Sequence, residues 1–174
     1  MLRLRPYKNT DAETIVQWLE DERTFRFWCA DKYSRFPVSD VEMNDYYLAR
    51  ECIYPMTAED DEGIAGHLTL RYENSELTDI RLGFVIVDPA RRGRGYGREL
   101  VRLAAKYAFI FMGAEKVGLS VFENNTRAHA CYLSAGFRDV TDRVYRPYTY
   151  KGEEWYCRNL EMDGDRAGKE GLIT

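Results

Sequence analysis

The sequence has few residues that bind zinc or form disulfides. It contains two histidines, His67 and His129, and its four cysteines form no Cys-x-x-Cys pair; they are Cys29, Cys52, Cys131 and Cys157. Structural zinc sites need closely spaced pairs of such ligands. We therefore expect no metal site, and we interpret the cysteines as reduced, mostly buried thiols.

Long apolar runs are also missing. No run reaches the ~18 residues that a membrane-spanning helix needs. The N-terminal stretch MLRLRPYKNT lacks the apolar core of a secretory signal. These absences predict a cytoplasmic protein that does not span a membrane.

An excess of positive charge is absent too, because 25 lysines and arginines are opposed by 29 aspartates and glutamates, giving a formal net charge of −4. General nucleic-acid binding depends on excess positive surface, so we expect no nucleic-acid partner. The arginines are instead concentrated in one segment, VDPARRGRGYGR, over residues 87–98. An acidic chain with one basic segment indicates a small polyanionic ligand bound there.

The length and composition suit one globular domain, since 45% of the 174 residues are hydrophobic and 31% are charged. We expect this single domain to cover residues 1–162. Residues 163–174 are polar and contain glycine, which predicts a flexible C-terminal tail.

Hydrophobic periodicity predicts the order strand, helix, helix, three strands, helix, strand, helix and two strands. The aromatic-rich segment 25–36 is expected to be irregular or briefly helical, and the acidic residues 59–63 a solvated hairpin tip. The last two strands, near 140–145 and 155–162, are expected to pair as a hairpin. In the strand over 79–87, alternation puts four apolar residues on one face: Ile80, Leu82, Phe84 and Ile86.

The basic segment lies between an apolar strand and an amphipathic helix. A helix N-terminus exposes unpaired N–H groups, and glycines at 93, 95 and 97 allow close approach of a phosphate. This context predicts a pyrophosphate-binding loop. The P-loop sequence GK[ST] is absent, and the spacing of the glycines differs from the dinucleotide fingerprint GxGxxG, which disfavours an NAD-type oxidoreductase.

Two stretches resemble motifs of a known family. Residues 92–97, RGRGYG, follow Val87-Asp88-Pro89 and fit the pattern [RQ]-x-x-G-x-[GA]. The pattern N-x-x-A-x-x-x-Y-x-x-x-G-F is met by Asn125, Ala128, Tyr132, Gly136 and Phe137. In these motifs the sequence resembles the GNAT superfamily of acetyl-CoA-dependent N-acetyltransferases.

The resemblance covers about residues 2–162 and implies an α+β fold with αβα layers. In that fold about four helices flank a mixed, mostly antiparallel sheet of about seven strands, with the pyrophosphate-binding loop after the fourth strand. No metal is implied. Acetyl-CoA would be the acyl donor, and a small-molecule or peptide amine would be the acceptor.

The resemblance also implies positions for the cofactor. The backbone of Val85, Ile86 and Val87 would pair with the pantetheine arm as an added strand, and Asn125 would bond this arm or cap its helix. Arg91 is interpreted as a solvated surface residue. The pyrophosphate would bind the remaining loop residues: Arg92, Gly93, Arg94, Gly95, Tyr96, Gly97 and Arg98.

Acetyl transfer needs support for an oxyanion, a proton for the departing thiolate and a base for the amine. A backbone N–H near residues 85–87 could polarise the carbonyl, and Tyr132 could be the general acid. Well-known members of the family often carry a glutamate base where this chain has Arg81. Asp79, Glu73 and His67 are the alternative base candidates, and a structural role for His67 is equally open.

The acceptor is not determined by the sequence. Aromatic residues in the N-terminal third could form its wall, with Glu42 and Asp45 nearby to favour a cation: Trp18, Phe25, Phe27, Trp28, Tyr33, Phe36, Tyr46 and Tyr47. Polyamines, aminoglycosides, amino acids and protein N-termini all stay open. A non-catalytic acyl-CoA-binding module is the alternative function, and an exposed edge near residues 140–160 could support a homodimer.

Overall fold

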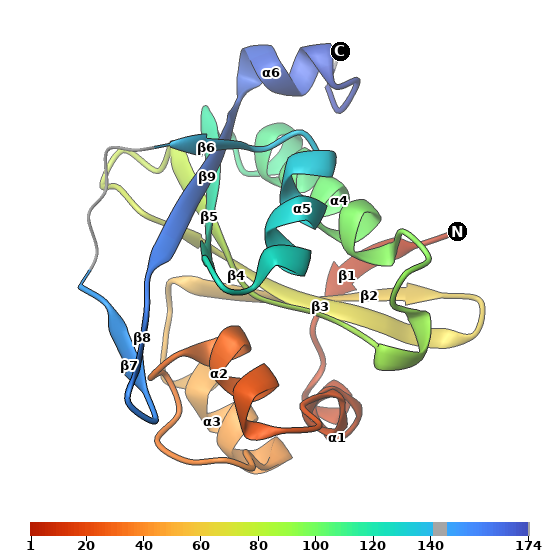
Figure 1. Cartoon of the computed structure of the whole chain (residues 1–174). Coiled ribbons are helices and arrows are strands. Elements are labelled where there is room, and N and C mark those ends of the chain that lie inside the picture. The colour runs from red at the N-terminus through yellow and green to blue at the C-terminus, as the bar shows by residue number, and fades with distance from the viewer. Residues whose placement is uncertain (141–145, 174) are drawn as a thin grey trace.

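A seven-stranded mixed sheet is the centre of the computed structural model, which describes residues 1–140 and 146–173 (Figure 1). The strand order is β1-β2-β3-β4-β5-β9-β6, and among the described residues only the β4–β5 pair is parallel. These elements confirm the α+β class and the seven strands. The strands are β1 (Arg3–Pro6), β2 (Ile53–Asp60), β3 (Gly63–Tyr72), β4 (Asp79–Val87), β5 (Lys116–Phe122), β6 (Arg138–Val140) and β9 (Cys157–Asp163).

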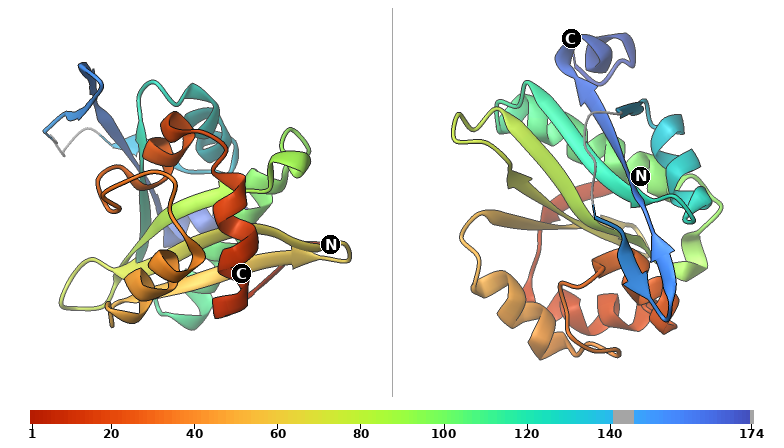
Figure 2. Two further views of the ribbon diagram at one scale, coloured as in Figure 1. Left: turned by 90° about the horizontal axis from the view of Figure 1, so that it is seen from below. Right: turned by 60° about the vertical axis from the view of Figure 1, so that its left-hand side comes forward.

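Helices cover both faces of the sheet, as expected for αβα layers (Figures 1 and 2). One face packs against α4 (Tyr96–Phe111) and α5 (Thr126–Ser134), and the other packs against α1 (Ala12–Ile15), α2 (Glu22–Cys29) and α3 (Asp40–Leu48). Short 3₁₀ turns lie at η1 (Asn9–Asp11), η2 (Val16–Trp18) and η3 (Pro89–Arg91). Within the described ranges, no helix is long and apolar enough to cross a bilayer.

Helix α2 lies partly in the segment expected to be irregular or briefly helical. It begins where the Asp21 carboxylate accepts a hydrogen bond from the Thr24 backbone N–H at 2.8 Å. It ends before Ala30, whose φ of 50° is not helical. Only Phe25 and Cys29 of this helix are buried. The helix has eight residues, fewer than the window over which helical periodicity is read from a sequence.

A β-bulge in β4 changes which residues share a face. Thr69 pairs with Gly83 and His67 with Ile86, so Leu68 lies opposite two residues, and Phe84 has a φ of 49°. The prediction that Ile80, Leu82, Phe84 and Ile86 share one face is therefore wrong. The first two pack with α4, whereas Phe84 and Ile86 pack with α1–α3.

The last strands pair differently from the expected hairpin. Strand β6 pairs with β9, and a separate two-stranded hairpin joins β7 (Tyr148–Tyr150) to β8 (Glu153–Trp155). Most of the expected strand at 140–145 lies outside the described residues. The β7–β8 hairpin packs on α2 through Trp155, whose ring centroid is 4.6 Å from that of Phe27.

The segment expected to be a flexible tail instead begins with α6 (Gly164–Lys169), at the end of β9 in Figures 1 and 2. The Asp163 carboxylate caps this helix by accepting from the Arg166 N–H at 2.8 Å. Ala167 and Leu172 are buried in the sheet core. The mostly polar composition of residues 163–174 did not indicate that these two apolar side chains are buried.

Truncating Leu172 tests this packing. Leu172→Ala should lower the free energy of unfolding by about 2–3 kcal/mol, because it deletes buried methyl groups. Urea unfolding followed by circular dichroism would measure the loss. The exposed Lys169→Ala is the control, and equal midpoints for the two variants would mean that the tail is not anchored.

Candidate active site

Strands β4 and β5 separate in the middle of the sheet. They pair over residues 79–81 and 116–118, and beyond this point a cavity of about 570 Å³ lies between them. The cavity is lined by residues 82–87 of β4, by Leu119, Ser120 and Val121 of β5, and by parts of α5 and of residues 92–98, which we call the glycine loop. We call it the glycine-loop cavity. The β4 edge facing it can offer backbone groups to an extended ligand.

The glycine loop has the geometry that anion binding requires. Gly93 and Gly95 have φ values of 77° and 85°, and a Cβ at either position would meet nothing within 4 Å. Gly95 is the N-cap of α4 and has no side chain to cap the first amides of the helix. Both glycines line the cavity. The positive end of the α4 dipole is therefore directed at open space.

Two of the loop arginines already have backbone partners. Arg98 Nε donates to the Ser134 carbonyl at 2.9 Å, and Arg92 Nε donates to the Val87 carbonyl at 3.3 Å. Both side chains line the glycine-loop cavity. The third, Arg94, lies 5.6 Å from the Tyr96 ring centroid and does not line this cavity.

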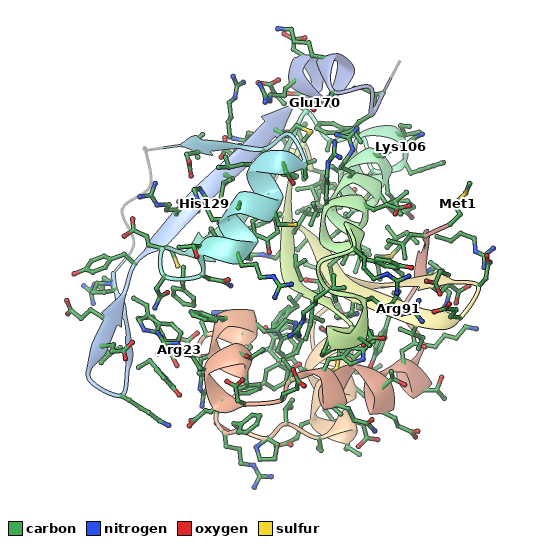
Figure 3. The ribbon with its side chains drawn as sticks, turned by 45° about the vertical axis from the view of Figure 1, so that its right-hand side comes forward. Met1, Arg23, Arg91, Lys106, His129 and Glu170 are labelled. Atoms are coloured by element: carbon green, nitrogen blue, oxygen red, sulfur yellow. The ribbon has the colours of Figure 1, made fainter. Side chains whose placement is uncertain are left out.

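The interpretation of Arg91 as a solvated surface residue is wrong, because Arg91 is buried and its ion pairs hold the glycine loop in place. Its guanidinium pairs with Asp60 and Asp88, and the Tyr96 hydroxyl donates to Asp60 at 2.7 Å. Figure 3 places Arg91 beside the β2–β3 hairpin. Hydrogen bonds from Arg91 and Tyr96 lower the pKa of Asp60 below its usual range.

These contacts also correct the interpretation of the acidic turn. Asp60 of the 59–63 segment is bound to the glycine loop rather than solvated, and Tyr96 supports the loop instead of facing the glycine-loop cavity. The β2–β3 hairpin therefore positions the loop. Sequence spacing could not reveal this contact, because Asp60 and Arg91 are 31 residues apart.

Tyr132 and Asn125 lie where the motif placed them, on the α5 side of the glycine-loop cavity. The Asn125 carboxamide accepts from the Ala128 N–H at 3.3 Å and so caps α5. Tyr132 is 8% exposed, and burial raises its pKa above the usual range. The phenol therefore stays protonated at neutral pH and has a proton to donate.

Two residues that were not among the predicted site residues also line this cavity. Ser120 is the polar interruption in the apolar run of β5, a signal that was visible in the sequence. Cys131 comes from α5, and its Sγ would lie 3.0 Å from a Cβ built on Gly97. The lack of a side chain at Gly97 thus lets α4 and α5 approach closely.

His67 is a structural residue rather than a base in contact with this site. It is fully buried, its Nε2 lies 2.7 Å from the Tyr47 hydroxyl, and it lines neither this cavity nor the one described below. Burial lowers its pKa from 6.5 to about 3. The ring is therefore neutral in the folded protein above this value.

This neutral histidine predicts acid sensitivity. Unfolded protein binds a proton at His67 below pH 6.5 and folded protein does not, so stability from this group is lost as pH falls from 6.5 towards 3. Between pH 7 and about pH 4.5 the wild type should lose about 2–3 kcal/mol more than His67→Gln. Urea unfolding at both pH values would measure this, and parallel losses would contradict it.

The two carboxylate candidates are engaged elsewhere. Asp79 pairs with Lys116 at 3.0 Å, at the closed end of the β4–β5 pair. Glu73 pairs with Arg81 at 3.1 Å and with Arg71 at 3.4 Å. In the part of the chain that the structure describes, no aspartate or glutamate lines the glycine-loop cavity. The structure thus brings none of the three base candidates to its wall.

A second cavity, of about 690 Å³, lies on the other side of the gap. We call it the aromatic cavity. Of the aromatic residues expected to form an acceptor wall, Phe27, Trp28 and Tyr46 line it; Glu42 and Asp45 do not. Trp28 Nε1 donates to the Phe84 carbonyl at 2.8 Å, which fixes the bulge against α2. Trp18, Phe25, Tyr33 and Tyr47 are buried core residues.

The two cavities share one wall. Seven residues line both of them: Phe27, Trp28, Leu82, Gly83, Phe84, Ser120 and Val121. The wall contains the bulge and the first residues of the separated strands. A molecule in one cavity therefore meets a molecule in the other at the gap between β4 and β5.

This fold and site place the chain in a family. Residues 12–137 match the sequence model of the Acetyltransferase (GNAT) family, and they make up more than half of the chain. The chain therefore belongs to the GNAT acetyltransferase family, as the two motifs indicated.

Individual proteins are also similar to this chain. A UPF0039 protein of Schizosaccharomyces pombe is 32% identical over 63% of this chain and 85% of its own length. The thialysine N-epsilon-acetyltransferase of Bos taurus is 29% identical over 56% of this chain, which spans about half (53%) of that relative. The fold is similar to that of the spermidine N-acetyltransferase of Vibrio cholerae in complex with CoA and spermine. That structure has a TM-score of 0.80, 20% identity, and coverage of 95% and 96% of the two chains.

Proposed function

We propose that the protein transfers an acetyl group from acetyl-CoA to a primary amine by direct attack in a ternary complex. The observation that carries this proposal is the wall shared by the two cavities. Acetyl-CoA occupies the glycine-loop cavity, with its pyrophosphate on the amides of residues 92–97 and its pantetheine arm along residues 85–87. The amine enters through the aromatic cavity and meets the thioester at the gap.

The residues at the gap supply two parts of the reaction. The amine nitrogen attacks the thioester carbonyl carbon, and a backbone N–H of the separated β4 edge stabilises the oxyanion. The C–S bond then breaks, Tyr132 donates its proton to the CoA thiolate, and the phenolate left on Tyr132 regains a proton from water before the next turnover. The amine loses its proton to water in the open aromatic cavity, because the base candidates Asp79, Glu73 and His67 do not line the shared wall.

A combined binding and turnover experiment tests this function. The protein is titrated with CoA by calorimetry and then incubated with acetyl-CoA and a panel of amines while thiol release is followed. We expect micromolar or tighter binding and amine-dependent thiol release. Binding without release for any amine would favour the non-catalytic acyl-CoA-binding module, and no CoA binding would overturn both functions. A cytoplasmic location and a homodimer stay predictions.

A further inference from the structure

We propose that the acceptor is an amine that carries a carboxylate, as an amino acid does, and that Arg50 and Arg71 bind this carboxylate in the aromatic cavity. The inference rests on the proposed acetyl transfer and names its substrate class. Three observations support it: the charges that line the cavity, the position of Arg50, and the row formed by Arg50, Arg71 and Arg81 along one side of the cavity.

The lining of the aromatic cavity is predominantly cationic. Among the described residues, its charged members are Lys32, Arg50, Arg71, Arg81 and Glu51. Its other lining residues are mostly aromatic or apolar, with the hydroxyl residues Thr69 and Ser120 among them. This arrangement is unfavourable for a polycationic amine, since like charges repel in a partly enclosed site. It suits an acceptor with an apolar or small body and a negative group away from the reacting nitrogen.

Arg50 is held in place by an aromatic ring rather than by a carboxylate. Its Cζ lies 3.6 Å from the Tyr46 ring centroid, and one Nη donates to the Tyr46 carbonyl at 3.0 Å. In the described part of the chain, no carboxylate oxygen lies within ion-pair distance of its guanidinium. Tyr46 in turn contacts Phe84 of the shared wall, with centroids 5.4 Å apart. The rest of the guanidinium is thus a positioned fork for a carboxylate.

Arg71 and Arg81 continue the positive charge across the sheet. They are register partners on β3 and β4, and Arg71 is also the register partner of Ile53 on β2. The Ile53 N–H bonds the Arg50 carbonyl at 3.5 Å, which brings Arg50 to the end of this row. Arg71 and Arg81 share the carboxylate of Glu73. Of the two, Arg71 is the more exposed and is available to the acceptor.

The row also sets the direction of the acceptor. The shared wall begins at Leu82 and Gly83, directly after Arg81 on β4. An acceptor with its carboxylate on Arg50 and Arg71 therefore points its amine towards the gap and the thioester. Productive orientation by a charged anchor lowers the entropy cost of reaching the transition state.

Matched acceptors test the proposal. A set of L-amino acids and the corresponding carboxamides, together with spermidine, is assayed for thiol release from acetyl-CoA with wild type and Arg50→Gln. We expect each acid to have a kcat/KM at least about tenfold above its amide, the worth of one charge-assisted hydrogen bond. Arg50→Gln should remove this preference mainly through KM and leave CoA binding unchanged.

Arg35→Gln is the matched control, since Arg35 is an exposed arginine outside both cavities that pairs with Glu42 at 3.3 Å. Amides or spermidine used as well as the acids, or equal effects of the two substitutions, would overturn the proposal. If CoA binds and no amine is acetylated, acetyl transfer fails as the function. The carboxylate site is then tested by calorimetry, in which N-acetyl amino acids and the corresponding amides are titrated into the CoA complex. Tighter binding of the acids that depends on Arg50 supports the site, and equal affinity for acids and amides rejects it.

Discussion

Replacing Tyr132 with phenylalanine should lower kcat by about 10²- to 10⁴-fold and leave the dissociation constant of CoA within about twofold. Tyr132 lines the glycine-loop cavity beside the β4–β5 gap, where we propose that the thiolate departs. Burial raises its pKa, so Tyr132 keeps its proton across neutral and mildly alkaline pH. Without it the thiolate must take a proton from water, which is not positioned.

For the Tyr132→Phe variant, single-turnover kinetics would measure the rate of acetyl transfer and calorimetry would measure the affinity for CoA. The ring packs in the sheet core, and phenylalanine keeps that packing, so the thermal midpoint should change little. Tyr107→Phe on α4 is the control, because Tyr107 is partly buried and lines neither cavity. A Tyr132→Phe variant with wild-type kcat would remove Tyr132 from the mechanism.

The glycine loop shows which part of the site could be predicted from sequence. A phosphate-binding turn depends on local backbone freedom and on the start of a helix, and both are encoded within residues 87–98. The positive φ angles of Gly93 and Gly95 and the N-cap position of Gly95 follow from that short segment. Asn125 and Tyr132 could be placed for the same reason, since one short helix carries them both.

The remainder of the site depends on contacts between distant segments. The burial of Arg91 depends on its ion pair with Asp60, which is distant in the sequence. Strict alternation in β4 fails because Phe84 has a left-handed φ, which the local sequence does not indicate. The base candidates were proposed from their place on or near strands. Ion pairs between distant residues, such as Glu73 with Arg81, decide which carboxylates are engaged. Tertiary contacts likewise anchor Leu172 in a tail whose composition is polar.

Gly95→Ala is expected to weaken CoA binding by about 10²- to 10⁴-fold. Its φ of 85° disfavours any L side chain, but a Cβ at this position meets no protein atom within 4 Å. The free protein should therefore lose only about 1–2 kcal/mol of stability. The larger loss belongs to the ligand, because the methyl group occupies the space in front of the α4 amides. Each charge-assisted hydrogen bond displaced there is worth about 1.5–3 kcal/mol.

Gly152→Ala separates backbone strain from ligand exclusion. Gly152 has a φ of 84°, a Cβ there also meets nothing within 4 Å, and it does not line the glycine-loop cavity. Both substitutions should lower the thermal midpoint by similar amounts, since the backbone strain is the same. Calorimetric titration with CoA should then show normal affinity for Gly152→Ala and a large loss for Gly95→Ala. If the two variants bind CoA equally well, the pyrophosphate does not bind at the N-terminus of α4, because the added methyl group would otherwise exclude it.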